Sequence, residues 1–177
     1  MRRPLKLHPQ AACAAVAGIE VEIAHPTGGG LLLSYAVTGV MADLLLPHAA
    51  APARTDELWR HTCFEAFIKD AAGEAYYEFN FAPSTQWAAY HFDRYRGGMR
   101  LAIEIEPPQI VVQSAPDRYT LRATLSLPGG QGDRNLRIGV AAVIEESNGN
   151  LSFWALAHPP GRPDFHHHDG FMLELGA

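Results

Sequence analysis

Hydrophobic and polar residues alternate along most of this chain with a period of two. In the segment from residue 18 to 24, for example, Ile19, Val21 and Ile23 are separated by Glu20 and Glu22. One face of such a segment is apolar and the other is charged, which is typical of a half-buried β-strand. Almost no segment has the 3.6-residue period of an amphipathic helix, so the pattern predicts an all-β fold.

The alternating segments are short, and glycine, proline, asparagine or aspartate residues separate them. They are Gly18–Ala24, Leu31–Val40, Cys63–Lys69, Glu74–Phe81, Trp87–Asp93, Leu101–Glu106, Gln109–Ser114, Tyr119–Leu127, Leu136–Glu145, Leu151–Ala157 and Phe171–Leu175. Residues 41–54 form an Ala- and Pro-rich connection, and Asn148-Gly149 is the strongest hairpin signal. About ten short strands of this kind predict one antiparallel, jelly-roll-like β-sandwich domain over residues 1–177.

Composition narrows the classes of function. The chain has 177 residues and a formal net charge of −5, and it has no basic stripe that would neutralise nucleic-acid phosphates. No stretch is long and apolar enough to span a membrane. Residues 1–17 imitate a signal peptide but continue directly into the first predicted strand, so we expect a cytoplasmic protein. Cys13 and Cys63 are then expected to be free thiols.

The segment from Glu57 to Gly97 is the richest in chemistry. It holds two of the three tryptophans, four of the six tyrosines and five of the eight phenylalanines, interleaved with carboxylates, amides and guanidinium groups. Aromatic rings stack on the apolar faces of sugars, and planar polar groups hydrogen-bond their hydroxyls. The same composition also fits half of an ordinary sheet core, so both interpretations stay open.

Two segments of this region, residues 63–69 and 74–81, read as a hairpin with a four-residue loop. With Lys69 opposite Glu74, Glu65 lies directly across from Glu78, and opposed like charges destabilise a sheet. An arginine such as Arg94 or Arg96, a bound metal, a raised pKa or the hydroxyl groups of a ligand would compensate. The alternatives are a solvated outer face and, less well supported, a paired-carboxylate glycoside hydrolase.

A second unusual segment follows the last long strand. His166, His167 and His168 are consecutive, and in an extended chain His166 and His168 project to one side. With Asp164 they form a candidate ligand set for a divalent metal, in a metal-binding protein or a metal-dependent enzyme. The alternative is a Pro-rich surface loop whose imidazoles bond to backbone carbonyls.

Several motifs together resemble one known family. They are LWRHTCFEAFI at residues 58–68, YYEFNFAPS at 76–84, WAAYHF at 87–92, and a tail with Trp154 and residues 163–167. This order resembles the DOMON-like domains related to family 9 carbohydrate-binding modules, small bacterial proteins with a β-sandwich fold. The resemblance implies a stacking role for Trp59, a hydroxyl-binding role for Glu65, and a second clamp tryptophan for which Trp154 is the nearest candidate.

The resemblance also implies a guanidinium group at the site, for which Arg94 and Arg96 are the candidates. Other DOMON branches bind haem, but no Met–His spacing here fits axial ligands, so haem is not expected. The leading hypothesis is a non-catalytic module that binds a carbohydrate on a concave sheet face. In it, Trp59 stacks, Glu65 and Glu78 accept hydroxyl protons, and Asn80 and Arg94 complete the polar ring. A β-sandwich that binds a protein partner, or forms a homodimer, is the further alternative.

Overall fold

The computed structural model of the chain describes residues 1–24, 30–127 and 135–175. Within these ranges the fold is all-β, and its regular elements besides strands are short 3-10 turns. The turns are η1 (Met41–Asp43), η2 (Leu58–Arg60) and η3 (His168–Gly170). No helix in the described part of the chain is long and apolar enough to cross a membrane. The predicted all-β, sandwich-like class is therefore confirmed.

Twelve antiparallel strands are formed by the described residues. They are β1 (Arg2–Leu7), β2 (Val16–Ala24), β3 (Leu31–Gly39), β4 (Cys63–Asp70), β5 (Tyr76–Phe81), β6 (Trp87–Phe92), β7 (Arg100–Leu101), β8 (Gln109–Ala115), β9 (Arg118–Leu125), β10 (Leu136–Glu145), β11 (Leu151–Ala155) and β12 (Leu173–Leu175). Their order is β7-β6-β5-β4-β10-β11-β1-β2-β3-β9-β8, with β12 paired to β10.

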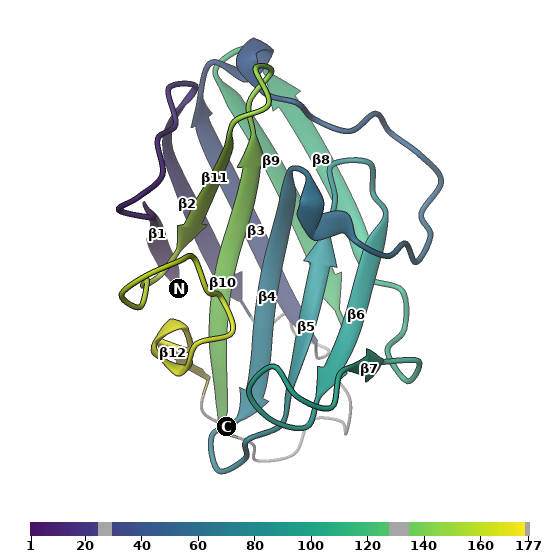
Figure 1. Cartoon of the computed structure of the whole chain (residues 1–177). Helices are drawn as coiled ribbons and strands as arrows, with labels where there is room; N and C mark the ends of the chain where they lie inside the picture. The colour runs from purple at the N-terminus through teal and green to yellow at the C-terminus, as the bar shows by residue number, and fades with distance from the viewer. Residues whose placement is uncertain (25–29, 128–134, 176–177) are drawn as a thin grey trace.

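The sheet curls into two layers, which Figure 1 shows one behind the other. The front sheet contains β4, β5, β6, β10 and β11, and the back sheet contains β2, β3, β8 and β9. Strand β1 joins them, because residues 2–5 pair with β2 whereas Lys6 and Leu7 pair with β11. The sequence pattern did not predict β1, whose basic residues and Pro4 hide the alternation.

The strand predicted over Leu101–Glu106 is wrong except for its first residue. Ile103 is 83% exposed, whereas Ala102 and Ile105 are buried, so the segment turns instead of alternating. The guanidinium group of Arg54 fixes this turn by donating to the carbonyl oxygens of Ala102 (3.0 Å) and Ile105 (3.1 Å). A side chain distant in sequence thereby replaces the hydrogen bonds that a partner strand would have supplied.

The main core lies between the two layers. On the front sheet it is built by alternate residues such as Phe64, Ala66, Phe79 and Phe81, which belong to the face predicted to be the core. The opposite, outer face of the same sheet has an apolar cluster of its own. This second cluster consists of Phe67, Tyr76, Ala88, Tyr90, Phe92, Ala141, Ala155 and Phe171, with Leu58 and Phe165 packed against it.

The register predicted for the β4–β5 hairpin is wrong by two residues. Lys69 pairs with Tyr76, not with Glu74, so Glu65 lies opposite Asn80 and Glu78 lies opposite Phe67. A shift of two preserves the faces, because side chains alternate with a period of two. Glu65 and Glu78 thus share the outer face but are diagonal neighbours. The β10–β11 hairpin was predicted correctly, and Gly149 adopts the left-handed conformation that its turn requires (φ 83°).

The outer face of the front sheet is covered, not solvated. The segment after β11 crosses this face, and it is drawn in yellow in front of β10 in Figure 1. Gly139 on β10 permits close approach, since a Cβ there would lie 2.9 Å from the carbonyl oxygen of Gly170. Strand β12 then returns to pair with β10. This cover, together with η2, encloses the space described next.

Candidate binding site on the outer face of the front sheet

A cavity of about 440 Å³ opens on the outer face of the front sheet. Its lining residues come from the sheet, the loop after β6, the turn η2 and the segment after β11. They are Trp59, Glu65, Glu78, Phe92, Arg96, Met99, Val143, Phe153, Pro163, Phe165 and His166. The size and the mixture of aromatic walls with a few convergent polar groups are those of a site for a small molecule.

Two carboxyl groups form the floor of the cavity. Glu65 on β4 is 3% exposed and Glu78 on β5 is 6% exposed. Asn80 donates from Nδ2 to Oε1 of Glu78 at 2.8 Å, and its own Oδ1 accepts a long hydrogen bond from the Cys63 thiol. The carboxyl group of Glu65 has no hydrogen-bond or ion-pair partner among the described residues. Because Glu65 lines the cavity, a molecule that enters the cavity can supply this missing partner.

Burial makes both carboxyl groups weaker acids than usual. The pKa of Glu65 is raised well above its ordinary value by desolvation and, secondly, by the charge of Glu78. The pKa of Glu78 is also raised by desolvation, although the hydrogen bond from Asn80 and the charge of Arg96 oppose the rise. Carboxyl groups with raised pKa values in a cavity make that cavity a candidate functional site.

One wall of the cavity is a hydrogen-bonded network. Arg96 donates from Nη2 to Asp164 at 2.8 Å, and the hydroxyl of Tyr76 accepts the backbone N–H of Arg96 and lies 2.7 Å from Nδ1 of His166. Burial raises the pKa of Tyr76 to about 12, so the phenol stays protonated at neutral pH and donates a hydrogen bond to Nδ1. Nε2 of His166 is 3.7 Å from Glu78.

The imidazole of His166 in this wall is neutral at neutral pH. Burial, followed by the positive charge of Arg96, lowers its pKa to about 4. The nearby carboxylate of Asp164 opposes this shift but does not outweigh it. His166 therefore serves as a hydrogen-bonding group in the wall and not as a counter-charge for the floor.

The turn η2 presents Trp59 at the rim of the cavity. Glu57 begins the turn in the left-handed region (φ 59°), and its carboxylate accepts a hydrogen bond from Arg60 at 2.7 Å. At the other end, Thr62 donates to the carbonyl oxygen of Leu45 at 2.7 Å. Trp59 itself is 45% exposed. A half-exposed indole at the mouth of an apolar cavity provides a stacking surface.

The structure brings together part of the predicted sugar site. Trp59, Glu65 and Glu78 line one cavity, and Asn80 lies beneath its floor. Trp154 does not line it: this side chain is 6% exposed in the core between the layers and donates to Ser152 at 3.0 Å. Phe153, one residue earlier and hence on the other face, lines the cavity instead.

Arg94, the predicted guanidinium, is exposed and does not line the cavity, whereas Arg96 does. Sequence reasoning also missed Phe165, Met99 and the role of His166 in the wall. Alternation along β11 contained the signal for Phe153. No local signal placed Phe165, because only the path of the segment after β11 brings it over the front sheet.

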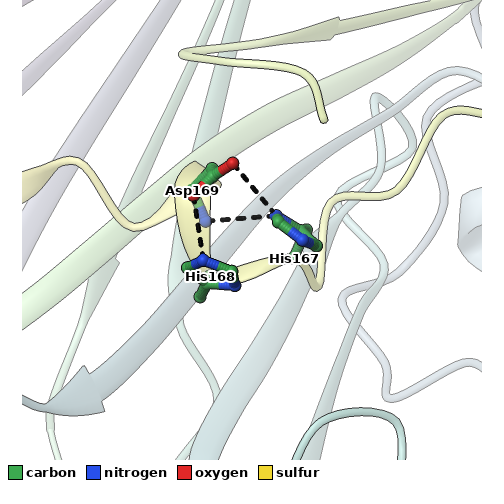
Figure 2. A group of neighbouring side chains, drawn as sticks. All are labelled: His167, His168 and Asp169. Atoms are coloured by element: carbon green, nitrogen blue, oxygen red, sulfur yellow. Dashed lines mark hydrogen bonds and ion pairs between the residues drawn. The ribbon is translucent and has the colours of Figure 1, made fainter. Parts of the chain in front are cut away.

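The predicted metal ligands are not brought together. Asp164 bonds to Arg96, His166 faces Glu78, and the exposed side chain of His168 lies apart from both. In Figure 2, His168 lies beside His167, and both imidazoles are joined to Asp169. The ligand atoms of these three residues all lie within 4.8 Å of one another. This surface group has the donor types that a divalent cation takes, but all three ligands belong to one short turn.

No family model matches the sequence, and no curated protein matches it either. A match does exist among solved structures. The crystal structure of a proposed carbohydrate-binding protein from Bacteroides uniformis superposes with a TM-score of 0.64 and 15% sequence identity. The match covers 97% of this chain and 84% of that chain. At this level of identity the likeness shows a shared fold.

Proposed function

We propose that this protein binds a carbohydrate or a similar polyhydroxylated small molecule in the cavity on its front sheet, without catalysis. Trp59 stacks on an apolar face of the ligand, while Glu65 and Glu78 accept hydrogen bonds from its hydroxyl groups. Arg96, which lines the cavity, takes the role expected of Arg94. We also propose that the protein is related to the DOMON-like domains and the family 9 carbohydrate-binding modules.

The observation that carries the proposal is the combination of Trp59 at the rim with the unpartnered carboxyl group of Glu65 at the floor. An exposed indole above a buried acceptor is unfavourable for the isolated protein, and a ligand with one apolar face and several hydroxyls satisfies both groups. The fold shared with the Bacteroides uniformis protein, itself proposed to bind carbohydrate, supports the same assignment.

A thermal-shift screen tests the proposal. Purified, untagged protein is heated with neutral monosaccharides, disaccharides, amino sugars and nucleotide sugars in separate wells. A ligand that binds only the folded state raises the melting temperature once its concentration is well above Kd. We expect at least one carbohydrate to raise the melting temperature of the wild type and to have no effect on Trp59→Ala. Silence from every class of sugar would contradict the proposal.

A further inference from the structure

The charges around the cavity do not balance. Its floor holds two acidic side chains, Glu65 and Glu78. Because His166 is neutral, the only cation that lines the cavity among the described residues is Arg96. The Arg96 side chain donates twice to one oxygen of Asp164, from Nη2 at 2.8 Å and from Nε at 3.3 Å. Arg96 forms no ion pair within 4 Å with either floor carboxyl group in the described structure.

Another glutamate with low exposure, Glu146, provides a comparison for the hydrogen bonding of Glu65. Glu146 is 5% exposed, close to the exposure of Glu65, yet it accepts hydrogen bonds from three donors. These are the backbone N–H groups of Ala14 (3.0 Å) and Ala15 (2.9 Å) and the side-chain amide of Asn150 (2.6 Å). Glu65 has none of these supports and lines a cavity, so its missing partner is expected to enter from outside.

From this imbalance we infer that the ligand carries a protonated amine, which the carboxylates of Glu65 and Glu78 bind together. The inference rests on the proposed function, and it specifies the substrate class as an amino sugar or a comparable polyhydroxylated amine. An ammonium group has three donors and no acceptor, so it satisfies two carboxylates that have almost no donors of their own. Hydrogen bonds between oppositely charged partners are also the stronger kind.

The walls of the cavity favour the same ligand. Phe92, Phe153 and Phe165 line it and Trp59 stands at its rim, and the faces of aromatic rings attract cations. A neutral sugar would bring no counter-charge to either carboxyl group, and only Glu78 feels the positive charge of Arg96. Burying like charges side by side without a cation is costly, whereas a bound ammonium group offsets both charges at once.

Calorimetric titrations with matched sugars test the inference. Glucosamine, N-acetylglucosamine and glucose share one ring, and only the first carries a cationic amine. Galactosamine, N-acetylgalactosamine and galactose repeat the comparison with one hydroxyl inverted. All titrations are run at neutral pH in EDTA. We expect the free amine of at least one series to bind about tenfold or more tightly than both of its neutral counterparts, without any added metal.

Two isosteric variants and one control locate the effect. Glu65→Gln and Glu78→Gln keep the shape of the floor but remove one negative charge each, and either should reduce the preference for the free amine to less than about threefold. Glu104→Gln removes a surface carboxylate that pairs with Arg100 outside the cavity, and it should leave the preference unchanged. Circular dichroism of each variant verifies that it is folded.

Each outcome of the titrations decides between the two proposals. If glucose or an N-acetylated sugar binds as tightly as the free amine, the amine inference is overturned while carbohydrate binding stands. If the amine preference persists in both floor variants, the inference is overturned as well. In a repeat without EDTA, binding of neutral sugars that requires added calcium or magnesium would identify a metal between the carboxyl groups and overturn the inference. If no sugar of either series binds, the inference falls, and the wider sugar screen decides the proposed function.

Discussion

Glu65 and Glu146 are two buried glutamates in one small protein, and they have opposite surroundings. Hydrogen bonds from Asn150, Ala15, Ala14 and Cys13 lower the pKa of the Glu146 carboxyl group, with Asn150 as the largest contributor. Desolvation and the neighbouring Glu78 instead raise the pKa of Glu65. The first arrangement stabilises the fold, whereas the second weakens the isolated protein and is expected where a site has been kept ready for a ligand.

The first prediction concerns Glu65→Gln, which removes a buried charge without changing shape. Because the folded-state pKa of Glu65 is raised, its stabilising contribution is complete below the unfolded value of about 4.3 and is lost as the pH rises through the folded value. Glu65→Gln should therefore become more stable than the wild type as the pH is raised from about 4 to 8. We expect a gain of roughly 1–3 kcal/mol in the free energy of unfolding at the upper end, measured by urea denaturation without ligand.

Glu146→Gln is the matched control, and we expect the opposite change in its stability at neutral pH. Its lowered pKa gives stability that is present above the unfolded value and is lost as the pH falls, so this variant should be less stable than the wild type at neutral pH. A Glu65→Gln variant that behaved like Glu146→Gln would show that the Glu65 carboxylate has structural donors after all.

The second prediction separates two tryptophans that the sequence alone placed in one site. Trp59→Ala removes a half-exposed indole and should change the free energy of unfolding by less than about 1 kcal/mol. Trp154→Ala opens a hole in the core between the layers and should cost about 3–5 kcal/mol. Denaturation of both variants under the same conditions gives the comparison. Equal losses would mean that Trp59 is a core residue.

At the scale of elements, the segment after β11 converts a sheet face into a cavity. Phe165 and Phe171 pack on the outer cluster, His166 bonds to Tyr76, and Gly139 lets the backbone of Gly170 lie directly on β10. Without this cover, Glu65 and Glu78 would face water and would be ordinary surface carboxylates. The segment after β11 therefore buries the two carboxyl groups and gives them their raised pKa values.

The third prediction tests this cover through Gly139→Ala. The new Cβ would lie 2.9 Å from the carbonyl oxygen of Gly170 and 3.3 Å from its carbon, so the segment must move away from β10. We expect a loss of about 1–3 kcal/mol in stability and at least a tenfold loss of ligand affinity. Gly18→Ala on the back sheet is the control, because its Cβ would meet only the Thr38 hydroxyl at 3.7 Å. Unchanged affinity in Gly139→Ala would show that the segment does not shape the site.

The sequence predicted the strands themselves better than it predicted their register and the contacts between distant segments. Alternation is a local property, so it located most strands and assigned Phe64 and Glu65 to opposite faces correctly. Register is not local: the loop between the paired residues Lys69 and Tyr76 is two residues longer than predicted, so Glu65 lies opposite Asn80 and not opposite Glu78. The wall residues His166 and Arg96 come from segments about 70 residues apart, and only the completed fold brings them together.

At the scale of the whole molecule, the front sheet does two tasks with its two faces. Its inner face packs with the back sheet into the main core, and its outer face carries the cavity. Strand β1 connects the layers by pairing with both β2 and β11. Because the core is complete without the cavity, side chains in the cavity can change with moderate effects on the fold. This separation explains how two buried carboxyl groups are tolerated.

The most direct test of the central claim is a titration followed by the tryptophan indole N–H signals in a ¹⁵N-labelled sample. The chain has three tryptophans, and only Trp59 lines the cavity, whereas Trp87 and Trp154 are buried in the core. When the best carbohydrate from the screen is added, the Trp59 indole signal should shift strongly and saturably while the other two remain nearly still. A saturable shift of the Trp87 or Trp154 signal with Trp59 unmoved would place the ligand elsewhere and contradict the account.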